Sequence, residues 1–313
     1  MGGARLLSVA GERAAQIVTN DELARRLDTS DEWIRSRSGI ARRGVAAAPE
    51  TVEALGLGAA AKAVSAAGID PLDIGLVLLA TSSQPTPVPG AAPVVALGVG
   101  ATNAVAFDIN AGCAGFCTAL GLAADSVRAG TAQHALVVGS ERMTDIVDQD
   151  DRATAVLFGD GAGAVVVGRS ETDEIGPVSW GTDATGAPLL TMPADTRHLA
   201  MDGQAVYRWA TTALADKARD AVHLAGISPR DLRGFVPHQA NLRIVNALVK
   251  ELDLDPACVI SDDVVDAGNT SAASVPLGLS RLIEEGRLQS GDPVLLFAFG
   301  AGLTWAGQVV RCP

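Results

Sequence analysis

The chain has 313 residues, enough for two halves that each bury a hydrophobic core. Hydrophobic residues make up 48% of it and aromatic residues only 4%, so we expect a closely packed α/β protein with an aliphatic core. The net charge of −12 argues against general nucleic-acid binding, which needs a cationic surface. The sequence contains no uncharged apolar run of 18 residues, so we predict no membrane-spanning helix.

The cysteines and the start of the chain bear on its compartment. Four cysteines are too few in a chain of this length for a disulfide framework; they are Cys113, Cys117, Cys258 and Cys312. Residues 1–7 show no signal-peptide core, so we expect a cytoplasmic protein. Cys113 and Cys117 have the spacing of a metal pair, but no histidine lies close to them in the sequence, so we expect no metal site.

Helical and strand-like segments alternate along the chain. Ala-rich stretches predict helices at 51–67, 114–129, 210–225 and 242–252, and runs of Val and Leu between them predict strands. This alternation predicts mostly parallel sheets covered by helices.

Segments of the first part of the chain recur in the same order in the second. The pairs are 67–79 with 225–237, 130–138 with 286–297, and 158–166 with 299–307. In the first pair, both members indicate a helix end closed by glycine, a proline turn and a buried strand. We therefore predict two related α/β halves, residues 1–170 and 171–313, which join near 169–175 and form a site at their junction.

Three polar residues stand in settings typical of catalysis. Cys113 precedes small residues and an apolar periodic run, which predicts a thiol at the first turn of a buried helix, where unpaired amides and the helix dipole favour the thiolate. His238 follows the apolar run 235–237 and is expected at a strand end, and Asn269 opens a segment that predicts another helix start. Together they provide a nucleophile and two hydrogen-bond donors for charge on a thioester oxygen.

Eight ordered motifs occur together in one known family; they lie at 19–20, 28–34, 38–40, 110–116, 151–154, 158–164, 237–243 and 268–274. On these motifs the whole chain resembles the β-ketoacyl-acyl-carrier-protein synthase III family of thiolase-like condensing enzymes. The intact set of Cys113, His238 and Asn269 separates it from elongating condensing enzymes, which use two histidines, and from thiolases, which use a second cysteine. The resemblance implies a thiolase-like α/β fold whose two pseudo-equivalent halves form α-β-α-β-α layers.

The resemblance implies a two-step condensation that needs no metal and no cofactor beyond the acyl-CoA substrate. An acyl-CoA primer would acylate Cys113, with the thioester oxygen held by the backbone amides of Cys113 and Ala301. Malonyl-acyl-carrier protein would then lose CO₂, and His238 and Asn269 would stabilise the enolate that attacks the acyl group. Phe299 matches the family's active-site phenylalanine, which makes the surroundings of the malonyl carboxylate less favourable for charge.

The resemblance also implies two binding surfaces. Trp33 would stack on the adenine of CoA, and the full set of expected CoA-binding residues is Thr29, Trp33, Arg37, Arg152, Gln204 and Asn241. Arg243 and Lys250 are seven residues apart on a predicted helix, so they share one face that would receive the acidic carrier protein. The full set of expected docking residues is Arg208, Gln239, Ala240, Asn241, Leu242, Arg243 and Lys250.

The primer and the pathway have alternatives. By resemblance, the loop with Val88 reaches the acyl pocket of the neighbouring subunit in a homodimer, and valine, smaller than the phenylalanine of some relatives, favours a primer larger than acetyl. The first interpretation is initiation of type II fatty-acid synthesis. The alternative is a primer synthase of a polyketide pathway, or transfer of the acyl group to a small alcohol. An inactive partner in a heterodimer would lack part of the triad, which is intact.

Overall fold

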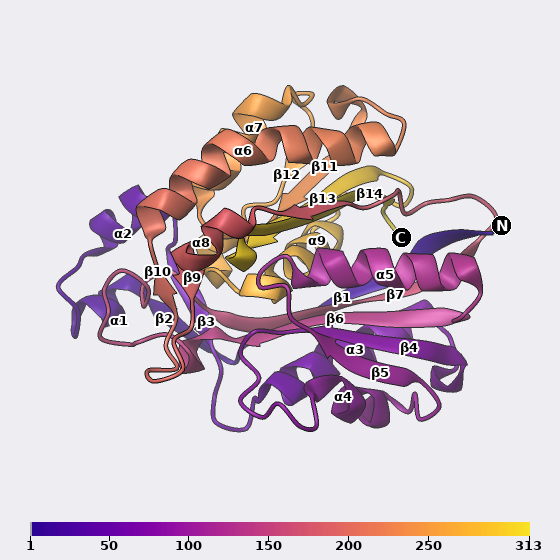
Figure 1. Cartoon of the computed structure of the whole chain (residues 1–313), viewed down its shortest axis with the longest axis horizontal. Helices are drawn as coiled ribbons and strands as arrows, with labels where there is room; N and C mark the ends of the chain where they lie inside the picture. Colours follow the sequence, from indigo (N-terminus) through magenta and orange to yellow (C-terminus); the bar gives the residue numbers. More distant parts are fainter. Residues whose placement is uncertain (1) are drawn as a thin grey trace.

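The computed structural model describes residues 2–313, and its core is two five-stranded sheets (Figure 1). The strands of the first sheet are, in spatial order, β1 (Gly3–Arg13), β7 (Asp160–Ser170), β6 (His134–Arg142), β4 (Ile74–Ala80) and β5 (Val105–Ile109). Those of the second are β12 (Val259–Ile260), β11 (Gly234–Pro237), β13 (Pro293–Gly300), β14 (Thr304–Arg311) and β8 (Ser179–Thr182).

The two sheets share one topology. In the first, β4, β5 and β6 are parallel, β7 is antiparallel to β6, and β1 is antiparallel to β7. In the second, β11, β12 and β13 are parallel, β14 is antiparallel to β13, and β8 is antiparallel to β14. The prediction of mostly parallel sheets is wrong here. Both sheets are mixed, because the chain returns from β6 to β7 and from β13 to β14 without a crossover helix.

Helices form three layers around the two sheets (Figure 1). The outer face of the first sheet is covered by α3 (Val52–Ala67) and α4 (Ala91–Val99), and that of the second by α6 (Gly203–Leu224) and α7 (Leu242–Leu252). Between the sheets lie α5 (Gly115–Ala129) and α9 (Ser274–Glu284). This arrangement confirms the α-β-α-β-α fold. Helix α5 contacts both sheets, and its Phe116, Leu120 and Ala124 are fully buried.

Local sequence signals set most helix boundaries. Thr51 is the N-cap of α3 and accepts a hydrogen bond from Ala54 N, and Gly68 ends this helix with a φ of 63°, which glycine adopts readily. Helix α7 spans the residues predicted for it. Helix α6 begins at Gly203 instead of residue 210, because the Asp202 side chain accepts a hydrogen bond from Ala205 N and so caps an earlier start.

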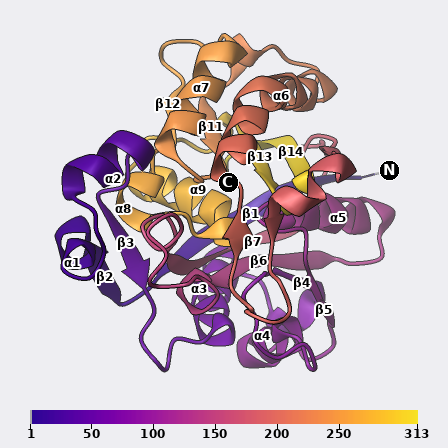
Figure 2. The same ribbon diagram turned by 60° about the vertical axis from the view of Figure 1, so that its left-hand side comes forward.

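Smaller elements cover one end of the sheets (Figure 2). These are the β2 (Gln16–Thr19) and β3 (Arg42–Val45) pair, the helices α1 (Asn20–Ala24), α2 (Asp31–Ser38) and α8 (Val264–Ala267), and the ribbon of β9 (Leu190–Thr191) and β10 (Ala200–Met201). Helix α2 packs against α7, and α8 against β3. The 3₁₀ helices are η1 (Pro71–Asp73), η2 (Met143–Asp145), η3 (Ala184–Leu189), η4 (Pro229–Asp231), η5 (Ser271–Ala273) and η6 (Ala301–Leu303).

Across residues 2–313, none of the helices combines the length and apolar character needed to cross a membrane. In the same part of the chain, no three His, Cys, Asp or Glu side chains are grouped as a metal site would require.

Candidate active site

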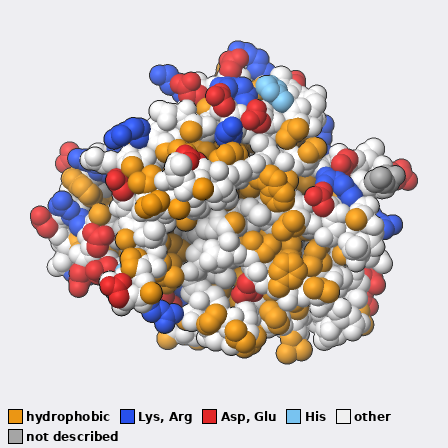
Figure 3. Space-filling model, viewed as in Figure 1, with side chains coloured by type: hydrophobic (Ala, Val, Ile, Leu, Met, Phe, Trp, Pro, Cys, Tyr) orange, Lys and Arg blue, Asp and Glu red, His pale blue; other side chains and the backbone are white. Residues whose placement is uncertain are grey.

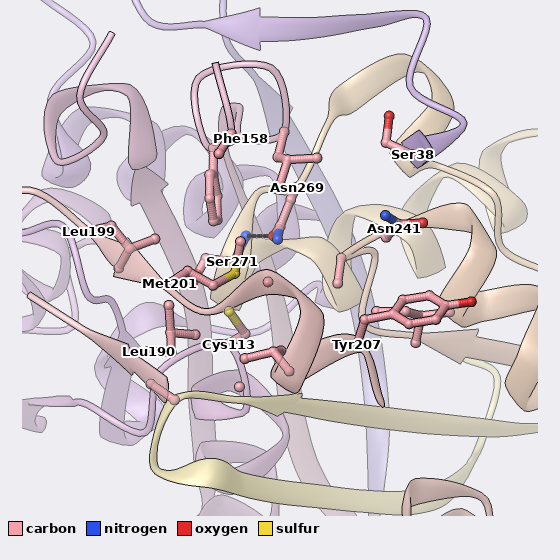
Figure 4. A pocket seen from close by; sticks show the side chains of 18 of the residues that line it. Ser38, Cys113, Phe158, Leu190, Leu199, Met201, Tyr207, Asn241, Asn269 and Ser271 are labelled. Atoms are coloured by element: carbon pink, nitrogen blue, oxygen red, sulfur yellow. Dashed lines mark hydrogen bonds between the residues drawn. The ribbon is translucent and has the colours of Figure 1, made fainter. Parts of the chain in front are cut away.

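A cavity of about 990 Å³ is lined by all three predicted catalytic residues. Figure 4 labels two of them, Cys113 and Asn269. Cys113 lies in the loop between β5 and α5, His238 follows β11 directly, and Asn269 lies between α8 and η5. Residues far apart in the sequence therefore meet because the loops after β5 and β11 open to the same end of the packed sheets.

Cys113 is buried at the start of the central helix. Its side chain is 8% exposed, and it lies one residue before Ala114, the N-cap of α5, and thus just outside the first turn. Burial raises the pKa of Cys113 to about 12; the Ser271 hydroxyl lowers it, and the charge of Glu141 raises it further. The predicted preference for the thiolate is therefore opposed by burial, and the local amides must offset that cost during the reaction.

Two glycines let the backbone segments beside the thiol approach each other closely. A Cβ atom on Gly300 would lie 2.8 Å from Cys113 N, and one on Gly112, whose φ is 54°, would lie 3.2 Å from Ala301 N. Larger residues at these positions would separate the segments. The amides of Cys113 and Ala301 thus lie in adjoining segments of the cavity wall, which suits an oxyanion site.

His238 is held as a neutral hydrogen-bond donor. Its Nδ1 is 2.7 Å from Ser274 Oγ, and the same oxygen accepts a hydrogen bond from Gln239 N. The Ser274 hydrogen is then free to point to Nδ1, which favours the tautomer with its hydrogen on Nε2. Burial lowers the pKa of His238 to about 3, so the ring stays uncharged at neutral pH.

Phe299 fixes the ring of His238 from the side. The two ring centroids are 5.2 Å apart at an interplanar angle of 77°, and Trp209 contacts Phe299 edge-on from α6. Phe299 is 2% exposed and lines the cavity, so it supplies an apolar wall beside the imidazole. An apolar wall disfavours charge near it.

Asn269 presents its amide nitrogen to the cavity. Its Oδ1 accepts a hydrogen bond from Ser271 N at 2.9 Å, which leaves Nδ2 as the donor of this side chain in the cavity that Cys113 also lines (Figure 4). The backbone of Asn269 is held against the 157–159 segment by hydrogen bonds from its N to Leu157 O and from Gly159 N to its O. The amide is therefore fixed both locally and across the fold.

Trp33 lies between two arginines. The Arg37 and Arg152 guanidinium carbons are 5.6 and 4.9 Å from its ring centroid, in cation–π contact. Trp33 and Arg37 line the cavity, whereas Arg152 donates a hydrogen bond to Asp28 O outside it. A base that stacks on the face now covered by Arg152 must displace that guanidinium.

The other predicted CoA residues have different surroundings. Gln204 is exposed at the start of α6 and lines the cavity. Asn241 also lines it, but its side chain caps α7 through Arg243 N and donates to Arg37 O, so it joins α7 to α2. Thr29 lies outside the cavity lining, and its buried hydroxyl has no hydrogen-bond partner within residues 2–313.

The predicted docking residues lie on α6, on α7 and in the loop that leads from β11 into α7. Arg208, Arg243 and Lys250 are exposed, while Ala240, Asn241 and Leu242 are half-buried. The Arg243 guanidinium stacks 4.9 Å from the centroid of Tyr207, which fixes it beside the cavity. Gln239 must be removed from the docking surface: it is 1% exposed, and its amide binds Pro237 O, Ser261 O and Val264 N. It has no free polar group for a partner.

An apolar wall of the cavity was missed in the sequence. Leu190 and Met201, on the β9–β10 ribbon, and nearby Leu199 lie on one side of Cys113, with Phe158 above (Figure 4). The only sequence signal was a few aliphatic residues in the otherwise polar stretch 190–203. An acyl chain on Cys113 would pack against these side chains.

Val88 does not line the cavity of its own chain. It lies in the loop between β4 and α4 and is 82% exposed.

This fold, with a buried cysteine thiol and two neutral donors in one cavity, defines a thiolase-like condensing enzyme of the acyltransferase class. Two family models match the chain: 3-oxoacyl-[acyl-carrier-protein (ACP)] synthase III over residues 107–184, and its C-terminal part over residues 222–312. The chain therefore belongs to the 3-oxoacyl-ACP synthase III family.

Individual relatives cover the whole chain. Beta-ketoacyl-[acyl-carrier-protein] synthase III 2 of Streptomyces avermitilis is 48% identical over 316 residues, covering 100% of both chains. A crystal structure of a priming beta-ketosynthase from a polyketide biosynthetic pathway is 44% identical, with a TM-score of 0.97, covering 100% of this chain and 97% of that one. 3-Oxoacyl-ACP synthase III of Aquifex aeolicus is 36% identical, with a TM-score of 0.93, covering 99% and 100%.

Proposed function

We propose that this enzyme joins an acyl-CoA primer to malonyl-acyl-carrier protein and releases CoA, CO₂ and a 3-ketoacyl-carrier protein, as the first condensation of type II fatty-acid synthesis. The observation that supports this best is one cavity that holds a buried thiol, Cys113, and two neutral donors, His238 Nε2 and Asn269 Nδ2. Neutral donors stabilise an enolate without protonating its carbon.

In the first step, the Cys113 thiolate attacks the thioester carbonyl of the primer. The oxygen gains negative charge and accepts hydrogen bonds from the backbone amides of Cys113 and Ala301. These two segments can lie close together because Gly112 and Gly300 have no side chain between them. The C–S bond to CoA then breaks, CoA leaves as its thiolate, and the acyl group remains on Cys113 beside the apolar wall of Leu190, Leu199 and Met201.

In the second step, the malonyl group of malonyl-carrier protein enters the same cavity. Its C–C bond to the carboxylate breaks, CO₂ leaves, and the electron pair forms an enolate whose oxygen accepts hydrogen bonds from His238 and Asn269. Phe299 makes the carboxylate's surroundings apolar, which favours loss of its charge as CO₂. The enolate carbon attacks the acyl carbonyl, and Cys113 leaves as a thiolate.

The proposal is tested by incubation with a panel of acyl-CoA primers followed by malonyl-carrier protein. Mass spectrometry should detect an acyl adduct on the enzyme and then the 3-ketoacyl-carrier protein. An adduct that moves to a small alcohol, with no carbon–carbon product, would instead favour simple acyl transfer.

Basic side chains beside the cavity support docking of an acidic carrier protein. Arg243→Glu or Lys250→Glu should raise the KM for malonyl-carrier protein about tenfold at low salt, because repulsion replaces attraction, and leave acylation by acyl-CoA nearly unchanged. Arg169→Glu, an exposed change on β7 outside the cavity, is the matched control. Equal effects on both substrates would remove this surface from the docking role.

An exposed apolar surface supports a homodimer. Strand β5 is an edge of the first sheet, and its Val105 and Phe107 are 64% and 46% exposed. Leu97 on α4 is 70% exposed, and apolar side chains gather around β5 and α4 in Figure 3. A second copy that pairs at this edge would cover both the apolar side chains and the open strand. Val88, in the adjoining loop, would then face the partner.

Val88 is proposed to set the primer size from the partner's side of the cavity. Turnover with isobutyryl-CoA or butyryl-CoA should be at least as fast as with acetyl-CoA, since each extra buried methylene gains roughly 0.8 kcal/mol where space allows. Val88→Phe should shift the preference toward acetyl by several-fold in kcat/KM. A strong preference of the unchanged enzyme for acetyl-CoA, or an unaltered ranking in the variant, would contradict this.

Priming of a polyketide pathway is the second candidate, because the priming beta-ketosynthase named above has nearly the same fold at 44% identity. Competition between a fatty-acid and a polyketide carrier protein for the acylated enzyme distinguishes the two. A cytoplasmic location is part of the proposal in either case.

A further inference from the structure

A buried carboxylate that the two steps above do not use lies behind the active site. Glu141, near the end of β6, is fully buried, and donors surround both of its oxygens. These come from Thr81 Oγ1, Ser82 N, Ser83 N, Ser83 Oγ and, at 3.4 Å, Ala272 N. Two loops that carry cavity residues are thus joined through one side chain.

The surrounding hydrogen bonds indicate the charged form. Ser83 Oγ accepts a hydrogen bond from Arg142 N, so its own hydrogen is free for Glu141 Oε2, and the three backbone groups can only donate. Burial raises the pKa of Glu141 above its usual value, and the hydrogen bonds to the carboxyl group lower it only in part. With donors on both oxygens, we assign an ionised carboxylate.

One of the two loops contains the proposed enolate donor. Ala272 follows Ser271, whose φ of 47° is uncommon for a residue with a side chain, and Ser271 N holds Asn269 Oδ1. The other loop contains Ser82, which lines the cavity, and continues to Val88. Glu141 therefore contacts the residue after the strained turn that orients the Asn269 amide.

We propose that Glu141 is a positioning residue for the condensation step: its carboxylate fixes the Ser271–Ala272 turn against the 81–83 loop, and this turn keeps Asn269 Nδ2 aimed at the enolate oxygen. This inference rests on the proposed function. It assigns Glu141 no contact with the substrate.

The test is Glu141→Gln, which keeps the size but replaces one acceptor oxygen by an NH₂ group that opposes the donors around it. Decarboxylation of malonyl-carrier protein should fall at least about tenfold in kcat, with little change in KM. Acylation of Cys113 by acyl-CoA should stay within about threefold of the unchanged enzyme.

A second measurement follows the Cys113 charge directly. The rate of alkylation by iodoacetamide rises with pH as the thiolate forms. Because the negative charge of Glu141 raises the pKa of Cys113, its removal should shift this profile to lower pH. The neighbouring titratable groups, His238 and Cys117, are buried and uncharged at neutral pH. The other charged residues that line the cavity are exposed: Arg37, Asp202, Arg208 and Arg243.

Asp160→Asn is the matched control. Asp160 is also a buried carboxylate held by backbone and hydroxyl donors, from Ala46 and Thr144, but it does not line the cavity. The Asp160→Asn substitution should lower the stability of the fold without shifting the pH profile of Cys113 alkylation. A folded Glu141→Gln enzyme with unchanged decarboxylation, or with an unshifted profile, would overturn the inference. Failure of the unchanged enzyme to condense would contradict the proposed function instead.

Discussion

Replacing Cys113 with alanine is expected to abolish both the acyl adduct and condensation, with a loss of at least about 10³-fold in rate, since no second thiol lines the cavity within residues 2–313. Of the cysteines in residues 2–313, Cys113 is the one that lines the cavity, and its segment lies beside the amide of Ala301. Intact-mass spectrometry after incubation with an acyl-CoA measures the adduct, and CoA release measures turnover.

Cys117→Ala is the matched control for this result. Cys117 lies one turn further along α5, is fully buried and does not line the cavity. Its replacement should leave the adduct in place and remove only packing. An adduct that persists in Cys113→Ala, or that maps to Cys117, would show that the nucleophile is wrongly assigned.

His238→Ala and Asn269→Ala are each expected to reduce malonyl decarboxylation by about 10²–10³-fold, the usual effect of removing one oxyanion donor. Acylation of Cys113 should continue in both, because the amides of Cys113 and Ala301 serve that step. Release of labelled CO₂ from malonyl-carrier protein and the acyl adduct on the enzyme measure the two steps separately.

The charge of the donors can be tested in the same assay. Asn269→Asp keeps the shape but places a carboxylate near the enolate, so it should be at least as damaging as alanine. Because burial lowers the pKa of His238 to about 3, this ring is neutral above that value, and decarboxylation should show no inflection from His238 between about pH 5 and 8. Loss of acylation with unchanged decarboxylation would show that the two steps are assigned in reverse.

The sequence by itself predicted a catalytic set whose three members line one cavity, and it determined much of the local structure. Cys113, His238 and Asn269 could be predicted together because each stands in a short motif whose backbone setting suits a reactive side chain. The ends of α3 and α7 followed from Thr51, Gly68 and apolar periodicity, which act within a few residues. The internal repeat predicted two related α/β halves, and the two sheets of the structure share one strand order, which agrees with that prediction without testing the proposed boundary.

Only the tertiary structure decided which polar groups are free to bind a partner. Gln239 belongs to a predicted docking motif, yet its side-chain amide makes three hydrogen bonds in the protein interior. The side chain of Asn241 caps α7 and donates a hydrogen bond to α2. Arg152 covers the ring of Trp33, although more than a hundred residues separate them in the sequence. Burial and hydrogen bonding of this kind depend on how distant segments pack, which no local pattern specifies.

The packing of distant segments is also why the sequence did not predict the apolar wall of the cavity or the contacts of Glu141. Leu190, Leu199 and Met201 form one surface only after the β9–β10 ribbon folds over Cys113. In the sequence, Glu141 only lies near the end of an apolar strand. Its hydrogen-bond partners in the 81–83 loop and at Ala272, 131 positions away, are brought to it by the fold. The sequence thus determined which chemistry the chain carries, and the packing of distant segments decided how that chemistry is oriented, because hydrogen bonds between them form only in the folded state.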